Sequence, residues 1–384
     1  MAIGKQLGAI MTTRMNFHAL SLFGIVSLPL LVVAGLLTVG AGRSELRESH
    51  ARQLTQIAEH IASATDAVVY RLVIDASVLG RLPNLHDAAA TANRVAYNEA
   101  STRRLDESWQ RGSSVPRPLD GLLTNSTSRF LGDLTSQDPI YREILLTDRF
   151  GRLIAASGRT SDYFQADEGW WTEAFGDGIR GRLFVSGVRY DESAQTDAIE
   201  IAVPVTTENS VVGVLKVIAD IRELTALVSG MRIGVTGDAR LVRPNGSVVL
   251  SRAAATDPPV NFFASDVLRQ RLQDSPPEGP GALYRLSFSA PARDGEIRLI
   301  GVASSQIGAS YPNLDWLVAV SQAESELFGP VDAQAQWLLL MLAVAALTMI
   351  LLAILYSSRL AAQPITGDIG LSTHPKIRRI DEPE

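Results

Sequence analysis

The side chains of this sequence that could do chemistry are carboxylates and aromatic rings rather than thiols or clustered imidazoles. The chain has no cysteine, which excludes disulfides, thiolate catalysis and cysteine-based zinc or iron–sulfur sites. No HExxH motif, phosphate-binding glycine loop or nucleophile elbow is present. The five histidines are scattered, without a pair at short ligand spacing: His18, His50, His60, His86 and His374. We therefore expect no cofactor, no metal and no enzyme, although a hydrolase built from dispersed carboxylates stays open.

Two uncharged runs, residues 17–41 and 336–357, are long enough to cross a bilayer. About 20 helical residues span a hydrocarbon layer of ~30 Å. The alternative for the first run is a cleaved signal peptide, but its apolar stretch is much longer than such peptides carry. Pro29 interrupts this run, which bilayer helices tolerate. We predict that both runs are transmembrane helices.

The charges beside these runs predict their orientation. Residues 1–16 carry Lys5 and Arg14 and no acid, and no Lys or Arg lies between Arg298 and Arg359. The positive-inside rule then predicts a two-pass protein of a bacterial inner membrane with both termini in the cytoplasm. The predicted division is a cytoplasmic N-terminus (1–16), a first span (17–41), an extracytoplasmic domain (42–335), a second span (336–357) and a short cytoplasmic tail (358–384).

The extracytoplasmic segment begins with a helical pattern. Apolar residues recur every three or four positions from Leu54 to Leu72, and residues 93–111 suggest a second, polar helix. The first stripe predicts packing on the domain body for its distal part, and it allows pairing with a second copy as a coiled coil near the membrane, which would give a homodimer.

Strand-like periodicity follows, in two modules: a distal module of about 120–230 and a membrane-proximal module of about 231–322. Pro204 implies an edge position or a bulge, and Asn245-Gly246 supplies the positive φ of a hairpin turn. The expected elements of the distal module are a hairpin over 144–156, a helix over 167–175, a strand over 182–190, a hairpin over 198–218 and a helix over 221–231. Those of the second module are a hairpin over 239–251 and strands over 283–289, 297–304 and 317–321, before a helix over 324–334. The fold class is therefore α+β, with a long N-terminal helix and two antiparallel-sheet modules between the two spans.

This order of elements resembles the double Cache family of extracytoplasmic sensors. The matching stretches are residues 147–157, Tyr163 with residues 168–171, residues 201–205 and residues 212–215. The resemblance implies two PAS-like modules and a small-molecule site in the distal one. Residues 359–365 also resemble the start of a HAMP linker, which the following glycines and prolines do not continue.

The resemblance also implies which residues contact the ligand. Tyr163, Trp170 and Trp171 match its aromatic positions and Asp220 matches an acid that holds an ammonium, while Glu168 stands where members that bind amino acids have Arg. Tyr190 is a further candidate for the lining. Two carboxylates and an aromatic wall favour an amine or other cation, by ion pairing and cation–π contact.

Each of these residues also has a structural interpretation. The two tryptophans could fill the core, Glu168 could cap the helix that follows it with Asp167, and Asp220 could cap the helix at residue 221. The expected function is a membrane-anchored sensor without its own output domain, which acts on a separate cytoplasmic or membrane partner. The alternative is an assembly protein that uses its Cache body as a protein-binding scaffold. Net charge −6 and a pI near 5.5 make a nucleic-acid partner improbable.

Overall fold

The structure is a computed structural model that describes residues 2–361, apart from 113–114, 192–195, 209, 252–261 and 278–282. It divides into two compact units. One comprises Glu45–Gly329, and the other comprises Met1–Ser44 with Pro330–Glu384. The predicted tail at 358–384 and the HAMP-like start at 359–365 lie for the most part outside the described residues.

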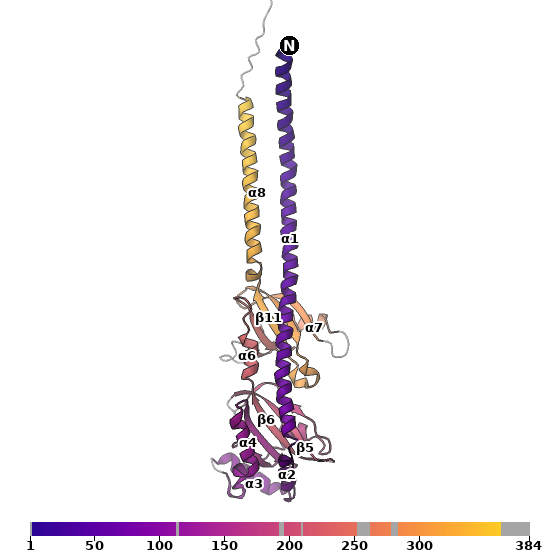
Figure 1. The fold of residues 1–384 in the computed structure, drawn as a ribbon, viewed down its shortest axis with the longest axis vertical. Coiled ribbons are helices and arrows are strands. Elements are labelled where there is room, and N and C mark those ends of the chain that lie inside the picture. Colours follow the sequence, from indigo (N-terminus) through magenta and orange to yellow (C-terminus); the bar gives the residue numbers. More distant parts are fainter. Residues whose placement is uncertain are drawn as a thin grey trace, which may run out of the picture. The chain divides into compact units, whose positions relative to one another are not determined.

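Two long helices supply the apolar unit. Helix α1 (Ala2–Leu79) confirms the long N-terminal helix, and α8 (Glu324–Ala361) is the last element described (Figure 1). In the described residues both are long and apolar enough to cross a membrane. Within this unit Gly35 of α1 lies close to Leu338 of α8, and Arg43 pairs with Asp332 at 3.3 Å.

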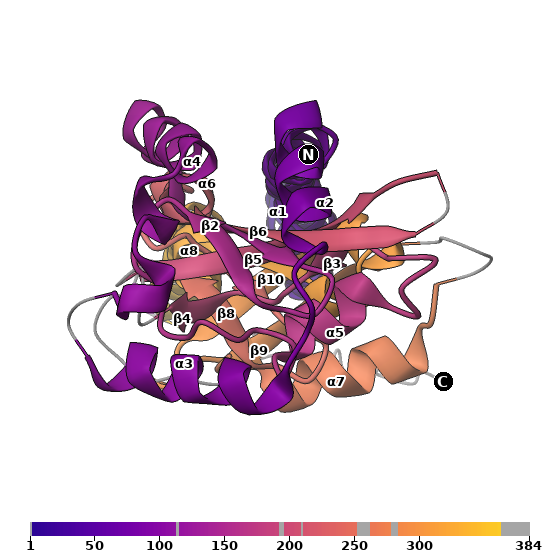
Figure 2. The same cartoon turned by 90° about the horizontal axis from the view of Figure 1, so that it is seen from below.

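The larger unit contains two antiparallel sheets (Figures 1 and 2). The distal sheet has the strand order β2-β1-β6-β5-β3, with β4 also paired to β5. The proximal sheet has the order β8-β7-β11-β10-β9. The distal strands are β1 (Tyr141–Asp148), β2 (Leu153–Ala156), β3 (Phe184–Val185), β4 (Arg189–Asp191), β5 (Thr196–Thr206) and β6 (Val211–Asp220). The proximal strands are β7 (Asp238–Val242), β8 (Val248–Ser251), β9 (Arg285–Pro291), β10 (Ile297–Ser304) and β11 (Leu317–Ala323). The two sheets therefore follow one plan.

Helices cover both faces of these sheets (Figure 2). One face packs against α1, α2 (Pro83–Ala92), α4 (Ser126–Gln137) and α6 (Arg222–Gly230) around a continuous apolar core. The other face carries α3 (Glu99–Arg111) and α5 (Gly169–Phe175) in the distal module and α7 (Ser265–Asp274) in the proximal one. Four short 3₁₀ turns complete the described elements: Arg117–Leu119, Leu122–Thr124, Ile307–Ala309 and Pro312–Leu314.

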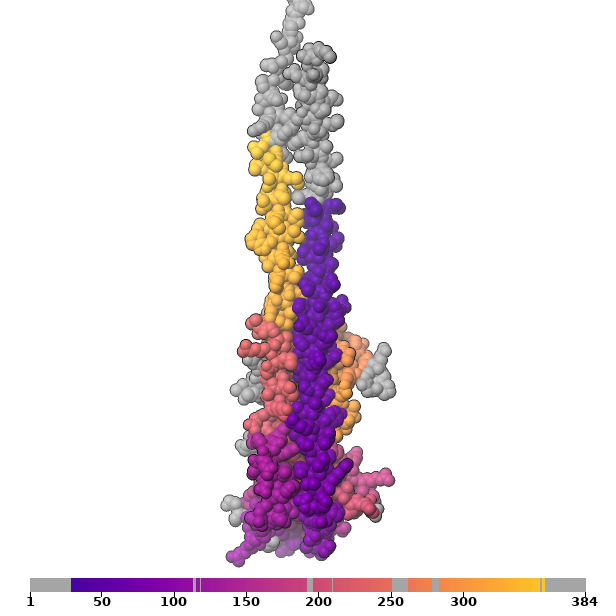
Figure 3. All heavy atoms as spheres, viewed as in Figure 1, coloured from indigo at the N-terminus to yellow at the C-terminus, as the bar shows by residue number. Residues whose placement is uncertain are grey.

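Helix α1 lies along one face of the larger unit, next to both sheets (Figure 3). Its apolar stripe is buried, from Leu54 through Ile61 and Val69 to Leu72. At Gly301 of β10 the backbones meet, because a Cβ there would lie 2.4 Å from the Thr55 nitrogen. In this unit the predicted stripe of α1 packs on the domain body.

Three sequence expectations need correction. The predicted helix over 93–111 begins only at Glu99, because Asn98 caps it by accepting a hydrogen bond from the Ser101 N–H at 2.9 Å. The predicted strand over 182–190 is two short strands, β3 and β4, separated at residues 186–188. Helices α2, α4 and α7 were not expected. Pro204 lies beside the bulge that separates Val205 from Thr206, in agreement with the expectation for a proline in a paired strand.

Candidate functional site

Helix α5 places the two tryptophans against the distal sheet. It begins after Glu168, and Trp170, Trp171 and Ala174 share its buried side. Trp171 donates from Nε1 to the Thr147 hydroxyl at 2.9 Å and stacks on Phe175 with ring centroids 4.5 Å apart. Both its polar atom and its ring are thus matched within the protein, so the core-filling interpretation describes Trp171 well.

Tyr163 lies in the same buried cluster. Its ring is 6.3 Å from that of Trp109 of α3, and its backbone N–H donates to Asp106 at 2.8 Å. Trp109 in turn donates from Nε1 to the Thr160 carbonyl at 2.9 Å. Burial raises the pKa of the Tyr163 hydroxyl above its ordinary value. Helix α3 therefore closes over Tyr163 as part of a packed core.

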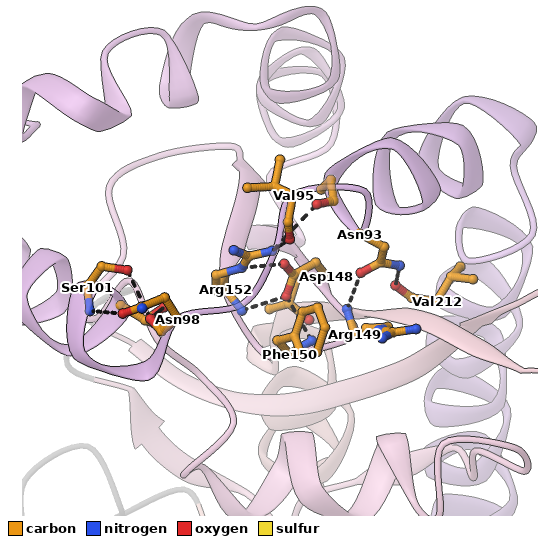
Figure 4. A network of polar contacts seen from close by, with 12 residues as sticks. Asn93, Val95, Asn98, Ser101, Asp148, Arg149, Phe150, Arg152 and Val212 are labelled. Carbon is orange, nitrogen blue, oxygen red and sulfur yellow. Dashed lines mark hydrogen bonds and ion pairs between the residues drawn. The ribbon is translucent and has the colours of Figure 1, made fainter.

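A polar network holds the segment that leads into α3 (Figure 4). Asp148 is fully buried at the end of β1 and pairs with Arg152 at 2.6 Å, while Arg152 also donates to the Val95 carbonyl at 3.1 Å. Asn93 accepts from the Arg149 N–H and donates to the Val212 carbonyl. These contacts tie the loop between α2 and α3 to the β1–β2 turn, which positions α3 over the sheet.

Trp170 faces a different environment, next to a buried charge pair. The Lys216 ammonium lies 5.0 Å from the centroid of the Trp170 ring and 3.2 Å from the Glu200 carboxylate. Lys216 is 8 % exposed and Glu200 7 %. Arg189 of β4 approaches the other oxygen of Glu200 at 3.6 Å. This is the charged centre of the distal module.

Strand register explains why these charges meet. Lys216 of β6 pairs with Leu145 of β1 and Ala202 of β5, while Ile218, two residues on, pairs with Glu143 and Glu200. Since alternate residues of a strand share a face, Lys216, Glu143 and Glu200 all lie on the α5 side of the sheet. Glu143 is buried as well.

Glu168 lies at the edge of this centre, directly before α5. Glu168 is the N-cap residue of α5, in agreement with the capping interpretation, but its side chain makes no cap hydrogen bond to the helix. Burial raises the pKa of its carboxyl above the ordinary value, and the nearby Lys216 charge opposes the rise. The Glu168 carboxyl is therefore within electrostatic reach of the Lys216–Glu200 pair.

Asp220 is held elsewhere. It accepts from Arg142 at 2.6 and 2.8 Å, from the Arg222 side chain at 2.9 Å and from the Arg222 N–H at 2.7 Å. The last bond is to the first residue of α6, in agreement with the capping interpretation. Thr147, the partner of Trp171, pairs with Val214, six residues and thus about 20 Å along β6 from Asp220. The structure does not bring Asp220 together with Trp171.

Tyr190 lies on β4 and is 57 % exposed, outside the buried cluster of Tyr163 and the tryptophans. Sequence reasoning missed Lys216, Glu200 and Arg189. A signal existed for the first of them. Lys216 is one of only three lysines in the chain and interrupts an otherwise apolar run from Val211 to Ala219.

Comparisons with known proteins agree with this architecture. A family model of the Cache domain matches residues 42–331. Among solved structures the chain is similar to the ligand-binding domain of the Campylobacter jejuni chemoreceptor Tlp3 with L-norvaline (12 % identity, TM-score 0.45), with 74 % of this chain and 94 % of that one covered. It is also similar to the ligand-binding domain of the Pseudomonas aeruginosa amino acid chemoreceptor PctB with L-Arg (16 % identity, TM-score 0.44), with 73 % and 98 % covered.

A third similar structure is the sensor domain of the Vibrio cholerae histidine kinase DctB (16 % identity, TM-score 0.44), with 73 % of this chain and 98 % of that one covered. No curated protein matches the chain. The family model covers well over half of the sequence, from residue 42 in α1 to residue 331 in α8. The protein belongs to the Cache domain family.

Proposed function

We propose that this protein is a membrane-anchored extracytoplasmic sensor of a small molecule. In this proposal the ligand binds on the α5 side of the distal sheet, and α1 and α8 carry the resulting change across the membrane to a separate signalling partner. The observation that carries the proposal is the buried Lys216–Glu200 pair beside Trp170, in a chain of the Cache family. Charged side chains are seldom buried, and desolvation makes such a pair costly, so its presence in the sheet face favours a functional role.

The ligand class in this proposal is an amine or other cation. Glu168, Glu200 and Glu143 offer three carboxylates on one side of the sheet, and Trp170 offers an aromatic face. Lys216 already lies over that face, so an incoming ammonium would compete with Lys216 for Trp170 and for Glu200. If the amine also carries a carboxylate, that carboxylate would become the new partner of the displaced Lys216. Of the six residues expected at the ligand, the proposal gives Trp170 and Glu168 direct contact and Tyr163 and Trp171 support from the core.

Calorimetric titration of the full chain in nanodiscs tests this proposal. The panel contains simple amines, amino acids, quaternary ammonium compounds and carboxylates without an amine. We expect an amine to bind, and Glu168→Gln and Trp170→Ala each to weaken it at least tenfold. Asp133→Asn, an exposed acid of α4, is the matched control and should leave affinity unchanged. Binding of carboxylates alone would contradict the ligand class, and a panel without any binder would favour the scaffold alternative.

The membrane topology belongs to the same proposal. Both termini are placed in the cytoplasm on the charges of residues 1–16 and of the tail. The chain has no cysteine, so a single cysteine introduced at Ser44 or at Thr12 can be labelled specifically in intact cells, which tests the orientation directly. We expect an impermeant maleimide to label position 44 and not position 12. The reverse labelling would invert the orientation.

A further inference from the structure

A cleft of about 490 Å³ opens at the end of the distal sheet where Asp220 ends β6. Its walls come from one turn of α1, from the loop of residues 138–140 with Tyr141 of β1, and from the start of α6. Sites for small organic molecules have volumes of roughly 300–1,000 Å³. The proposed function assigns nothing to this cleft. Of its lining, Asp220 was a predicted ligand residue, and its carboxylate is paired with Arg142 and Arg222.

The basic groups of the cleft are already matched. Arg71 of α1 pairs with Glu223 of α6 at 2.5 Å, and Arg222 pairs with Asp220 at 2.9 Å. Asp220 is 3 % exposed and has Arg142 as a second basic partner. An anionic ligand would therefore have to break an existing ion pair, or bind beside the four carboxylates of the lining without a basic partner.

Two carboxylates of the cleft have no such match. Among the described residues, Asp75 accepts the Tyr141 hydroxyl at 3.0 Å and has the Arg71 charge one helical turn away, and Asp138 accepts the Ile140 N–H at 3.0 Å. In the described part of the chain no basic side chain forms an ion pair with either carboxylate. Burial raises the pKa of the Tyr141 hydroxyl, its hydrogen bond to Asp75 and the charges of Asp75 and Asp138 raise it further, and the Arg71 charge opposes the rise. The lining of the cleft carries four carboxylates and two guanidinium groups, so its net charge is negative.

The remaining wall is apolar, with Leu72 and Ile140 beside the Tyr141 ring. The described residues contain no group of three side chains able to hold a metal ion. We infer that this cleft binds a small organic cation, a primary amine or short diamine, with ammonium groups against Asp75 and Asp138 and the alkyl chain on Leu72, Ile140 and Tyr141. An ammonium gains charge-assisted hydrogen bonds from the carboxylates and a cation–π contact from the ring.

Titration of the full chain in nanodiscs with 1,4-diaminobutane tests the inference, with 1,4-butanediol as the neutral probe of the same length and succinate as the anionic one. We expect the diamine to bind and the diol and succinate not to bind. Asp75→Asn and Asp138→Asn keep the side-chain shape and should each weaken diamine binding at least tenfold. Asp133→Asn should stay within twofold of the wild type, and unchanged melting temperatures will show that the variants are folded.

Variants of the other site separate this inference from the proposed function. Glu168→Gln and Lys216→Met should leave diamine affinity within twofold, because Lys216 lies four residues before Asp220 along β6, about 13 Å away. Diamine binding that is lost in Glu168→Gln and kept in Asp75→Asn would overturn the inference and would support the proposed function. No binding of the diamine to the wild-type chain, or equal binding of the diol, would also overturn it.

Discussion

The two modules have the same strand order, but the faces that α5 and α7 cover differ in chemistry. On the distal sheet the central residues of that face include Lys216, Glu200 and Glu143, all buried. On the proximal sheet the corresponding strands β11 and β10 present Ala319 and Val302, which pair with each other. Phe262, Phe288 and two leucines of α7 pack on this proximal face.

This difference suggests that the proximal face serves stability and the distal face serves ligand binding. Apolar side chains fill the proximal face and stabilise it by burial alone, at roughly 25 cal/mol per Å² of apolar surface. A buried ion pair returns less, since desolvation of both charges offsets most of their attraction. The distal face is thus less stable than an apolar face of equal size would be. Its charges are useful where a polar ligand must be bound.

The largest predicted effect concerns the proximal face. Phe262→Ala removes a ring that is 2 % exposed, and we expect a loss of about 3–5 kcal/mol in local stability. Native-state hydrogen exchange should show the loss in the β10 amides and not in those of β6. Val235→Ala, at a residue of the same module that is 92 % exposed, is the control and should change little. A loss below about 1 kcal/mol would mean that the proximal face is not a packed core.

The second prediction concerns a variant that makes the distal face more apolar, as the proximal face is. Lys216→Met leaves the buried Glu200 carboxylate without its closest partner, which costs about 3–5 kcal/mol for a fully buried pair. Arg189, at 3.6 Å from Glu200, offsets part of this, so we expect the lower end of that range in the exchange of β6 amides.

The double variant Lys216→Met/Glu200→Leu sharpens this prediction. With both charges gone, no buried carboxylate is left unpaired, and we expect stability within about 1 kcal/mol of the wild type. Amine binding should not return with the stability. If the double variant is as unstable as the single one, the distal face depends on its charges for packing and the contrast between the modules fails.

The strand pattern was accessible from sequence because alternation and turn residues are local signals. The hairpin from Ile144 to Ala156 and the hairpin at Asn245-Gly246 were expected and are present as β1–β2 and β7–β8. Helix α7 escaped notice because its sequence, Ser265–Asp274, is mostly polar and only Leu268 and Leu272 are buried. A short helix that owes its stability to two leucines on a sheet has too weak a period to be recognised alone.

The site was harder to predict because it depends on register. The position of Asp220 at the end of β6 was correct, but its partner Arg142 lies at the register shift of β1 between Tyr141 and Glu143, which no sequence signal revealed. The pair of Lys216 with Glu200 likewise arises only when β5 and β6 align Glu200 with Ile218. The residue types of α5 were enough to predict its aromatic wall. Its charged neighbours could be identified only from the pairing of residues across strands.

The smallest predicted effect decides which influence dominates at Glu168. Burial raises the pKa of this carboxyl and Lys216 lowers it, with burial the larger of the two. A raised folded-state pKa means that the folded protein binds the proton more tightly than the unfolded chain. The stability that this group contributes is then complete below its unfolded-state pKa of 4.5, and it falls as the pH rises through the folded-state pKa.

Glu168→Gln carries no titrating proton, so the melting temperature of the wild type should fall relative to that of the variant between pH 4.5 and neutrality. Because much of the Glu168 side chain is exposed, the difference should be small, and thermal melts of both proteins across this range will measure it. A wild type that gains on the variant as the pH rises would show that attraction to Lys216 outweighs burial, and that the charged centre of the distal module holds Glu168 as an anion.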